Sequence, residues 1–205
     1  MYRIGVDLGG TNIAVGVVNE ELKIIGRGKV KTKAPRPAAE IFDDIAFAVD
    51  LAVKDAGISM DDVKSVGVGT PGSVNKENGY IEFSNNLEFN QVPAKEMLEE
   101  RIGKPIYLEN DANAAAYGEF VAGAGKGTNN FIAITLGIIG VGFIDSKENQ
   151  ELKELRRQES NRKYTKSFLA LALPVAYLII DALGTVGDEI FFHYVDISDY
   201  SANSA

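Results

Sequence analysis

Cysteine is absent from the 205 residues of this sequence, and histidine occurs once, as His193. Disulfides and thiolate zinc sites are therefore excluded. His193 alternates with apolar residues in the segment IFFHYVDI, which is typical of a strand, and no nucleophilic arrangement or metal-ligand cluster can be built around it. Because the net charge is −8, the composition also argues against a general electrostatic attraction to nucleic acid or anionic lipid.

Long apolar runs are scarce as well. The run Phe168–Ile180 has 13 residues and is broken by Pro174, whereas a membrane-spanning helix needs about 20 residues. This run is either a kinked helix that covers an exposed face or a foreign terminus that favours self-association. The first residues lack the basic and apolar pattern of a signal peptide, so we expect a cytoplasmic protein.

Glycine and charge divide the chain into two parts. Of 21 glycines, 19 precede residue 147, and residues 147–166 carry seven basic and four acidic side chains with almost no apolar ones. Such a stretch is typical of a solvated connector, either a helix or a disordered segment. We predict an N-terminal domain at 1–130 and a truncated or divergent C-terminal segment at 131–205.

Apolar periodicity in the first part alternates between strands and helices. Strands are predicted at 3–7, 13–18, 63–69, 105–108 and 131–136, and helices at about 41–56, 93–102 and 112–122. This order predicts an α/β domain with a largely parallel core and an initial hairpin. Residues 4–19 and 132–145 also resemble each other, which indicates either a duplicated fold or two glycine-rich hairpins that are alike by chance.

The turn of the predicted first hairpin has the sequence Asp7-Leu8-Gly9-Gly10-Thr11-Asn12. Glycines let a backbone approach a phosphate closely, the Thr and Asn side chains add donors, and the aspartate could orient a Mg²⁺ ion. The alternative is a plain hairpin turn, in which Gly-Gly is common. No helix follows at the point that a P-loop or a dinucleotide fingerprint requires.

Two further segments are polar in an otherwise apolar context. One is Gly69-Thr70-Pro71-Gly72-Ser73-Val74-Asn75, predicted as a rigid turn after a strand, and the other is Ser84-Asn85-Asn86-Leu87. Neutral amides and backbone groups suit a polyhydroxylated ligand, since each sugar hydroxyl both donates and accepts. An ordinary asparagine-rich loop is the alternative.

The segment Glu109-Asn110-Asp111-Ala112 places an acidic residue where a strand meets a helix. Asp111 is either the N-cap of that helix or an acceptor at the carboxyl end of a strand, where the sites of α/β proteins gather. The helix dipole favours its ionised form. An ionised carboxylate suits a base that orients a hydroxyl during phosphoryl transfer.

Taken together, four motifs resemble the ROK family (repressors, open reading frames and kinases), and most closely its bacterial glucokinases. They are IGVDLGGTNIAVGVV, VGVGTPGSVN, FSNNL and LENDANAAAYGE, and the resemblance that they carry covers roughly residues 1–137. The resemblance implies an actin-like ATPase (ribonuclease H-like) fold, with ATP and a sugar bound in a cleft between two domains. It also implies transfer of the ATP γ-phosphate to a hexose hydroxyl with Mg²⁺.

The resemblance assigns roles to single residues as well. Those implied to face the phosphates of ATP are Gly9, Gly10, Thr11, Asn12, Thr135 and Gly137. Those implied to bind the sugar are Gly72, Ser73, Asn85, Asn110 and Asp111. Asp111 would be the catalytic base, and Asp7 would serve the metal ion.

The sequence departs from the family pattern in the second phosphate turn and beyond it. Ile138 and Ile139 stand where the family has small residues, and β-branched side chains resist the backbone conformations that enclose a phosphate. The family's E-x-G-H sugar motif, its cysteine-rich zinc loop and most of its second domain are not matched. We therefore predict an incomplete or atypical second domain, and phosphoryl transfer that is weak or absent in this chain alone.

The alternative function is a non-catalytic sugar-binding or assembly module. A DNA-binding repressor fits less well, because no winged-helix segment precedes Tyr2 and the charge is acidic. As partners we expect a sugar and ATP, no nucleic acid and no membrane. We also expect a homo-oligomer, which both the family and the apolar run favour.

Overall fold

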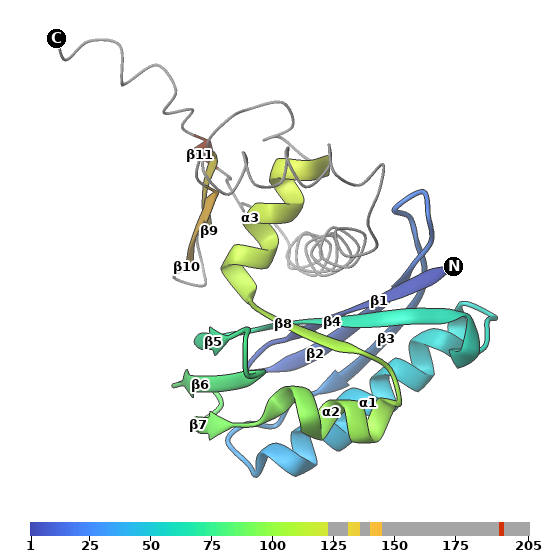
Figure 1. Cartoon of the computed structure of the whole chain (residues 1–205), viewed down its shortest axis with the longest axis horizontal. Coiled ribbons are helices and arrows are strands. Elements are labelled where there is room, and N and C mark those ends of the chain that lie inside the picture. Colours follow the sequence, from blue (N-terminus) through green and yellow to red (C-terminus); the bar gives the residue numbers. More distant parts are fainter. Residues whose placement is uncertain (123–130, 136–139, 145–192, 195–205) are drawn as a thin grey trace, which may run out of the picture.

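A mixed five-stranded sheet forms the centre of the molecule (Figure 1). The computed structural model describes residues 1–122, 131–135, 140–144 and 193–194. The strand order is β3-β2-β1-β4-β8; β1, β2 and β3 pair antiparallel, whereas β1, β4 and β8 run parallel. The predicted hairpin and parallel core are thus confirmed. The strands are β1 Tyr2–Leu8, β2 Asn12–Val18, β3 Ile24–Lys31, β4 Val63–Thr70 and β8 Ile106–Asn110.

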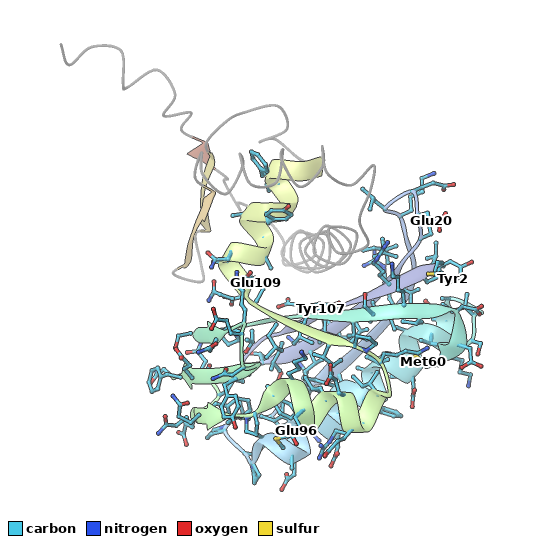
Figure 2. All side chains as sticks on the ribbon, in the orientation of Figure 1. Tyr2, Glu20, Met60, Glu96, Tyr107 and Glu109 are labelled. Carbon is cyan, nitrogen blue, oxygen red and sulfur yellow. The ribbon has the colours of Figure 1, made fainter. Side chains whose placement is uncertain are left out.

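Two helices cover one face of this sheet, namely α1, Ala38–Asp55, and α2, Ala94–Ile102. A short 3₁₀ helix, η1, Met60–Asp62, leads into β4. Alternate residues of β1, such as Ile4 and Val6, are fully buried, as are Ile41 and Ile45 on the apolar stripe of α1. Figure 2 shows side chains filling the space between sheet and helices. Each buried aliphatic side chain contributes about 1.5–3 kcal/mol, so this layer supplies most of the stability.

The contact between α1 and β3 depends on glycine. A Cβ atom on Gly28 would lie 2.1 Å from the carbonyl oxygen of Ala48, so only glycine lets the helix lie this close to the strand. No strand was predicted here. On its other face, β3 exposes Arg27, Lys29 and Lys31 along the outer edge of the sheet.

A second, smaller sheet extends from the carboxyl end of β4. Its order is β5-β6-β7, all antiparallel, with β5 Ser73–Asn75, β6 Tyr80–Ser84 and β7 Phe89–Val92. The prediction of a rigid turn over residues 69–75 was therefore wrong in extent, because the turn is confined to Pro71 and Gly72 and β5 begins at once. The Asn75 side chain accepts the N–H groups of Glu77 and Asn78, at 3.1 and 3.3 Å, and so reverses the chain into β6.

The third helix, α3, Asp111–Ala122, leaves the carboxyl end of β8 on the side of the sheet opposite α1 and α2 (Figure 1). It contacts the hairpin of β9, Phe131–Thr135, and β10, Gly140–Ile144. The strand predicted around His193 is confirmed, because β11, His193–Tyr194, pairs with β9. Both repeats of the internal resemblance therefore form antiparallel hairpins.

Several predictions fall outside the described residues. They concern Gly137, the isoleucines at 138 and 139, the connector at 147–166 and the apolar run at 168–180. Within the part of the chain that the structure describes, none of the helices has both the length and the apolar character needed to span a bilayer.

Candidate active site

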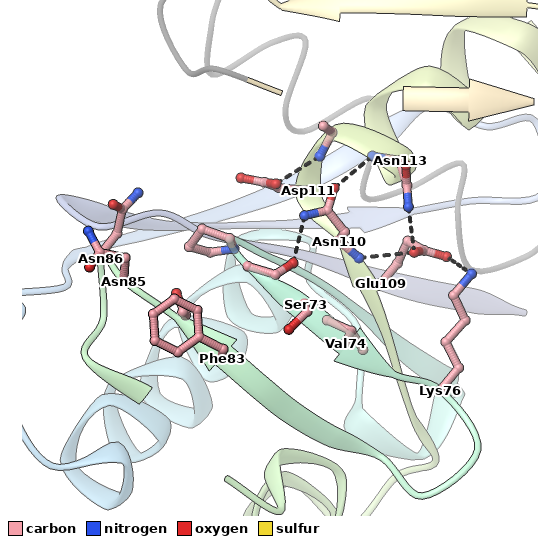
Figure 3. Close-up of a pocket in the computed structure, with 14 residues that line it drawn as sticks. Ser73, Val74, Lys76, Phe83, Asn85, Asn86, Glu109, Asn110, Asp111 and Asn113 are labelled. Carbon is pink, nitrogen blue, oxygen red and sulfur yellow. Dashed lines mark hydrogen bonds and ion pairs between the residues drawn. The ribbon is translucent and has the colours of Figure 1, made fainter. Parts of the chain in front are cut away.

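A pocket of about 600 Å³ lies where β4 and β8 end, between the β5–β6 hairpin and the first turn of α3 (Figure 3). Parallel strands bring their carboxyl ends to the same edge of a sheet, so segments 40 residues apart in sequence meet here. All five residues predicted to bind the sugar line the pocket. Its full lining is Pro71, Gly72, Ser73, Val74, Lys76, Phe83, Ser84, Asn85, Asn86, Glu109, Asn110, Asp111, Ala112 and Asn113.

Gly72 makes the pocket wall possible. Its φ is +102°, and a Cβ atom at this position would lie 2.0 Å from the carbonyl oxygen of Phe83. Any other residue would be strained by its backbone angles and would push β6 away. Gly72 is therefore required by the close approach of the turn after β4 to β6.

Asn110 joins this wall to α3. Its Nδ2 donates to the carbonyl oxygen of Gly72 at 2.9 Å, and its Oδ1 accepts the backbone N–H of Asn113 at 3.1 Å (Figure 3). The second bond is an N-cap interaction, since it satisfies a free N–H in the first helical turn. Asn110, rather than Asp111, is thus the cap of α3, and the capping alternative for Asp111 was wrong.

Asp111 is the first residue of α3, and its carboxylate is partly buried at the pocket. Burial raises the pKa of Asp111, while the N–H of Ala112, which donates to Oδ1 at 2.8 Å, and its own N–H lower it. The net direction is upward. The expectation that the start of the helix favours the ionised form is therefore outweighed by desolvation. A raised pKa increases the basicity of a carboxylate that has to take up a proton.

Asp7 lies at the end of β1, near enough to Asp111 for the two charges to repel each other. Burial, and then this repulsion, raise the pKa of Asp7 to about 7. In the described part of the chain, no group of three or more acidic or histidine side chains could hold a metal ion. Mg²⁺, however, is usually held by one or two carboxylates together with phosphates and water. A partly buried carboxylate that is paired with no cation among the described residues fits such an ion.

Lys76 and Glu109 form an ion pair in the pocket wall. The Lys76 Nζ lies 2.5 Å from Glu109 Oε2, and the Glu109 side chain is only 14% exposed. The other oxygen of Glu109 accepts the backbone N–H of Asn110 at 3.0 Å and the Asn113 amide at 3.4 Å. The pair therefore holds the residues on both sides of Asp111, and the positive charge offsets a buried carboxylate.

Most carbonyl oxygens of the predicted phosphate turn, Gly9–Asn12, are engaged inside the protein. Three of its carbonyl oxygens accept hydrogen bonds inside the protein: Asn12 from the N–H of Gly9 at 3.0 Å, Thr11 from the N–H of Thr32 at 3.0 Å, and Gly9 from the Thr32 hydroxyl at 2.6 Å. The N–H groups of Gly10 and Thr11 have no acceptor among the described residues. Free N–H groups in a turn are a common arrangement for binding an anion.

This turn lies beside the pocket. A Cβ atom on Gly10 would lie 3.6 Å from the Cβ of Asn86, which lines the pocket. The Oδ1 atom of Asn12 is buried without a hydrogen-bond partner in the described structure. A ligand in the pocket and one on the turn would therefore be neighbours.

Nine pocket residues were not predicted as site residues, namely Pro71, Val74, Lys76, Phe83, Ser84, Asn86, Glu109, Ala112 and Asn113. All of them except Lys76 belong to segments that had been singled out, so proximity in sequence could have indicated them. Lys76 comes from the β5–β6 hairpin, which was not predicted. Of the two residues predicted in the second phosphate turn, Thr135 is the last residue of β9, and Gly137 lies outside the described residues.

The model of the ROK family matches residues 3–150 of the sequence. The chain belongs to the ROK family. This match extends past residue 137, where the resemblance read from the sequence ends. Within the family, the chain is 46% identical over 142 residues to a glucokinase of Streptomyces coelicolor, which covers 69% of this chain and 43% of that protein. It is 32% identical over 146 residues to a putative xylose repressor of a Caldicellulosiruptor species, which covers 71% of this chain and 37% of the repressor.

Solved structures show the same fold. The chain superposes with a TM-score of 0.64 on a ROK family glucokinase from Streptomyces griseus in complex with glucose and AMPPNP, at 40% identity over 71% of this chain and 45% of the other. For the ROK hexokinase from Thermus thermophilus the TM-score is 0.62, at 32% identity over 71% and 47%. The fold is therefore that of the actin-like ATPases. The chain spans less than half the length of these relatives.

Proposed function

We propose that this chain takes part in the ATP-dependent phosphorylation of a hexose, with Asp111 as the base. The observation that carries the proposal is the position of a partly buried carboxylate in a pocket lined by amides. The pocket lies directly beside a turn in which two N–H groups have no acceptor within the described part of the chain. Amides suit sugar hydroxyls, and free N–H groups suit phosphates. The relatives that are glucokinases support this combination.

In the proposed reaction, Asp111 orients a sugar hydroxyl and accepts its proton. The hydroxyl oxygen forms a bond to the γ-phosphorus of ATP, and the bond from that phosphorus to the bridging oxygen breaks, so that ADP leaves with the electron pair. The base acts late in phosphoryl transfer, so the orientation of the hydroxyl matters more than high basicity. Asn110 and the ion pair of Lys76 and Glu109 fix Asp111 in place.

The phosphates are assigned to the turn Gly9–Asn12. Asp7 would hold Mg²⁺, which when bound neutralises charge on the phosphates. Thr135 and Gly137 are proposed to contribute from the second turn, and Ile138 and Ile139 to weaken it. We accordingly propose slow turnover for this chain alone.

A coupled assay with Mg²⁺, ATP and a panel of hexoses, combined with calorimetry of hexose binding, tests the proposal. We expect hexose binding, and slow turnover that is lost in Asp111→Asn. If none of the hexoses binds, the proposal is wrong. The isosteric Asn variant is the suitable control, because it keeps an acceptor for the N–H of Ala112.

The second candidate is a sugar-binding module without catalysis. It is favoured by the fact that, among the described residues, those that line the pocket lie between the turn after β4 and the first turn of α3, and none of them lies beyond Asn113. Hexose binding that does not depend on ATP, without any turnover, would support it. A repressor role is less well supported, since a net charge of −8 does not favour contact with DNA. A cytoplasmic location and a homo-oligomer remain predictions.

A further inference from the structure

We propose that Thr32 is a positioning residue for the nucleotide phosphates, because it withdraws carbonyl oxygens of the turn Gly9–Asn12 from the ligand. The inference rests on the proposed function, which assigns phosphates to this turn. It adds a residue that lies outside every recognised motif and outside the pocket.

Thr32 follows β3 directly and is fully buried. Its backbone N–H donates to the carbonyl oxygen of Thr11 at 3.0 Å, and its hydroxyl donates to that of Gly9 at 2.6 Å. One residue thus binds two carbonyl groups of the turn. Of these two contacts, only the hydroxyl bond depends on the side chain, so it can be removed by substitution without loss of the other.

The consequence is electrostatic. A carbonyl oxygen is the negative end of the peptide dipole and repels a phosphate, whereas an N–H attracts it. The carbonyl of Asn12 is bound as well, by the N–H of Gly9, so three carbonyl groups of the turn are engaged. The N–H groups of Gly10 and Thr11, in contrast, have no acceptor among the described residues. A glycine peptide released from Thr32 could rotate and present its oxygen instead.

Thr32 is held in turn by Arg36, which lies outside the turn. Its carbonyl oxygen accepts the Nε–H of Arg36 at 2.8 Å, and the guanidinium of Arg36 pairs with Asp44 of α1. The turn is therefore connected through Thr32 and Arg36 to the helix that packs on the core. Such support from outside the binding site keeps binding groups in place before the ligand arrives.

The test is Thr32→Val, which keeps the shape and the backbone N–H but removes the hydroxyl. Calorimetry should show binding of MgATP, and of pyrophosphate with Mg²⁺, weakened roughly tenfold or more, with the hexose affinity within about twofold of the wild type. Thr32→Ser should restore the phosphate affinity. Ser65→Ala, which removes a nearly buried hydroxyl near the start of β4, is the matched control and should bind MgATP normally.

Equal weakening of hexose and MgATP binding by Thr32→Val would overturn the inference, because it would indicate general damage to the fold. Unchanged MgATP affinity would overturn it as well, and neither outcome would affect the proposed function. If Thr32→Val fails to fold, Arg36→Met replaces it and should lower MgATP affinity in the same direction by about threefold; no change would count against the inference. A wild-type chain that binds hexose but neither phosphate ligand would remove both the inference and the assignment of the turn.

Discussion

The sugar pocket and the phosphate turn lie side by side but are built in different ways. The pocket presents side chains, mainly amides and carboxylates, that are held by other side chains such as Asn110 and Lys76. The turn presents backbone N–H groups, because Thr32 and the N–H of Gly9 bind its carbonyl oxygens. Substitutions within the pocket should therefore alter the chemistry directly, whereas those around the turn should act through the geometry of the backbone.

The largest effect is expected in the pocket, from Asp111→Asn. Loss of the base should reduce hexose phosphorylation by at least about 100-fold. Hexose affinity should change far less, because the amide still fits the site and still accepts the N–H of Ala112. A coupled assay and calorimetry measure the two quantities. Turnover that survives in this variant would mean that the pocket does not supply the base.

The backbone of the pocket wall gives the next largest effect. Gly72→Ala should lower the free energy of unfolding by about 3 kcal/mol or more and abolish hexose binding, since the new Cβ would collide with the carbonyl of Phe83. Gly103→Ala is the matched control, because Gly103 also has a positive φ, +68°, but faces open space. It should cost only about 1–2 kcal/mol. Equal losses in thermal denaturation would show that the close contact at Gly72 is unimportant.

Asp7 precedes the phosphate turn and repels the charge of Asp111 in the pocket, so its titration concerns both regions. Because its pKa is raised from 3.8 to about 7, the folded state holds the proton to higher pH than the unfolded state does. Stability should therefore fall as pH rises from about 4 to 7 and stay level above that. Asp7→Asn should stabilise the protein at pH 8 by an amount on the order of 2 kcal/mol and have no effect near pH 3, as measured by urea denaturation. If Asp7→Asn stabilised the protein equally at both pH values, the pKa of Asp7 would not be raised in the folded state.

The smallest effect is expected from the ion pair in the pocket wall. Lys76→Met leaves the carboxylate of Glu109 without its cation, and we expect a loss of about 1–2 kcal/mol in unfolding free energy, because the lysine itself is half exposed. Lys23→Met is the control: its pair with Glu21, at 3.9 Å, is more than 70% exposed on both sides and should contribute close to nothing. Identical melting curves for the two variants would show that the buried ion pair of Glu109 contributes no more to stability than an exposed one.

The sequence predicted the regular elements well and the short ones poorly. The strands β1 and β4 and the helix α1 could be predicted because apolar residues recur along each of them and are buried in the core. β5 to β7 are three to five residues long and carry polar residues such as Asn75 and Asn90, so no period can be read from them. β3 was missed because Gly26 and Gly28 occupy the positions where buried apolar side chains were sought.

In the site, too, some residues could be predicted from the sequence and others could not. The residues that belong to family motifs could be predicted, and the five predicted for the sugar meet in one pocket. Capping by Asn110 could not be separated from capping by Asp111, because both residue types cap helices and the choice depends on where β8 ends. Thr32 carries no motif at all. Its importance arises only when the end of β3 pairs with the turn between β1 and β2.

The charged edge of β3 has a consequence for assembly. Another sheet can add to an outer strand whose backbone groups are free, and like charges along the strand are a common protection against this. In β3, the backbone N–H of Arg27 is already bound by the Asp55 carboxylate, at 2.9 Å. Two copies of β3 placed edge to edge would bring Arg27, Lys29 and Lys31 of each chain together, with a repulsion that grows as salt is removed. Continuous growth of the sheet from one molecule to the next is therefore disfavoured at this edge. If this protein forms a homo-oligomer, we expect it to do so through a different surface.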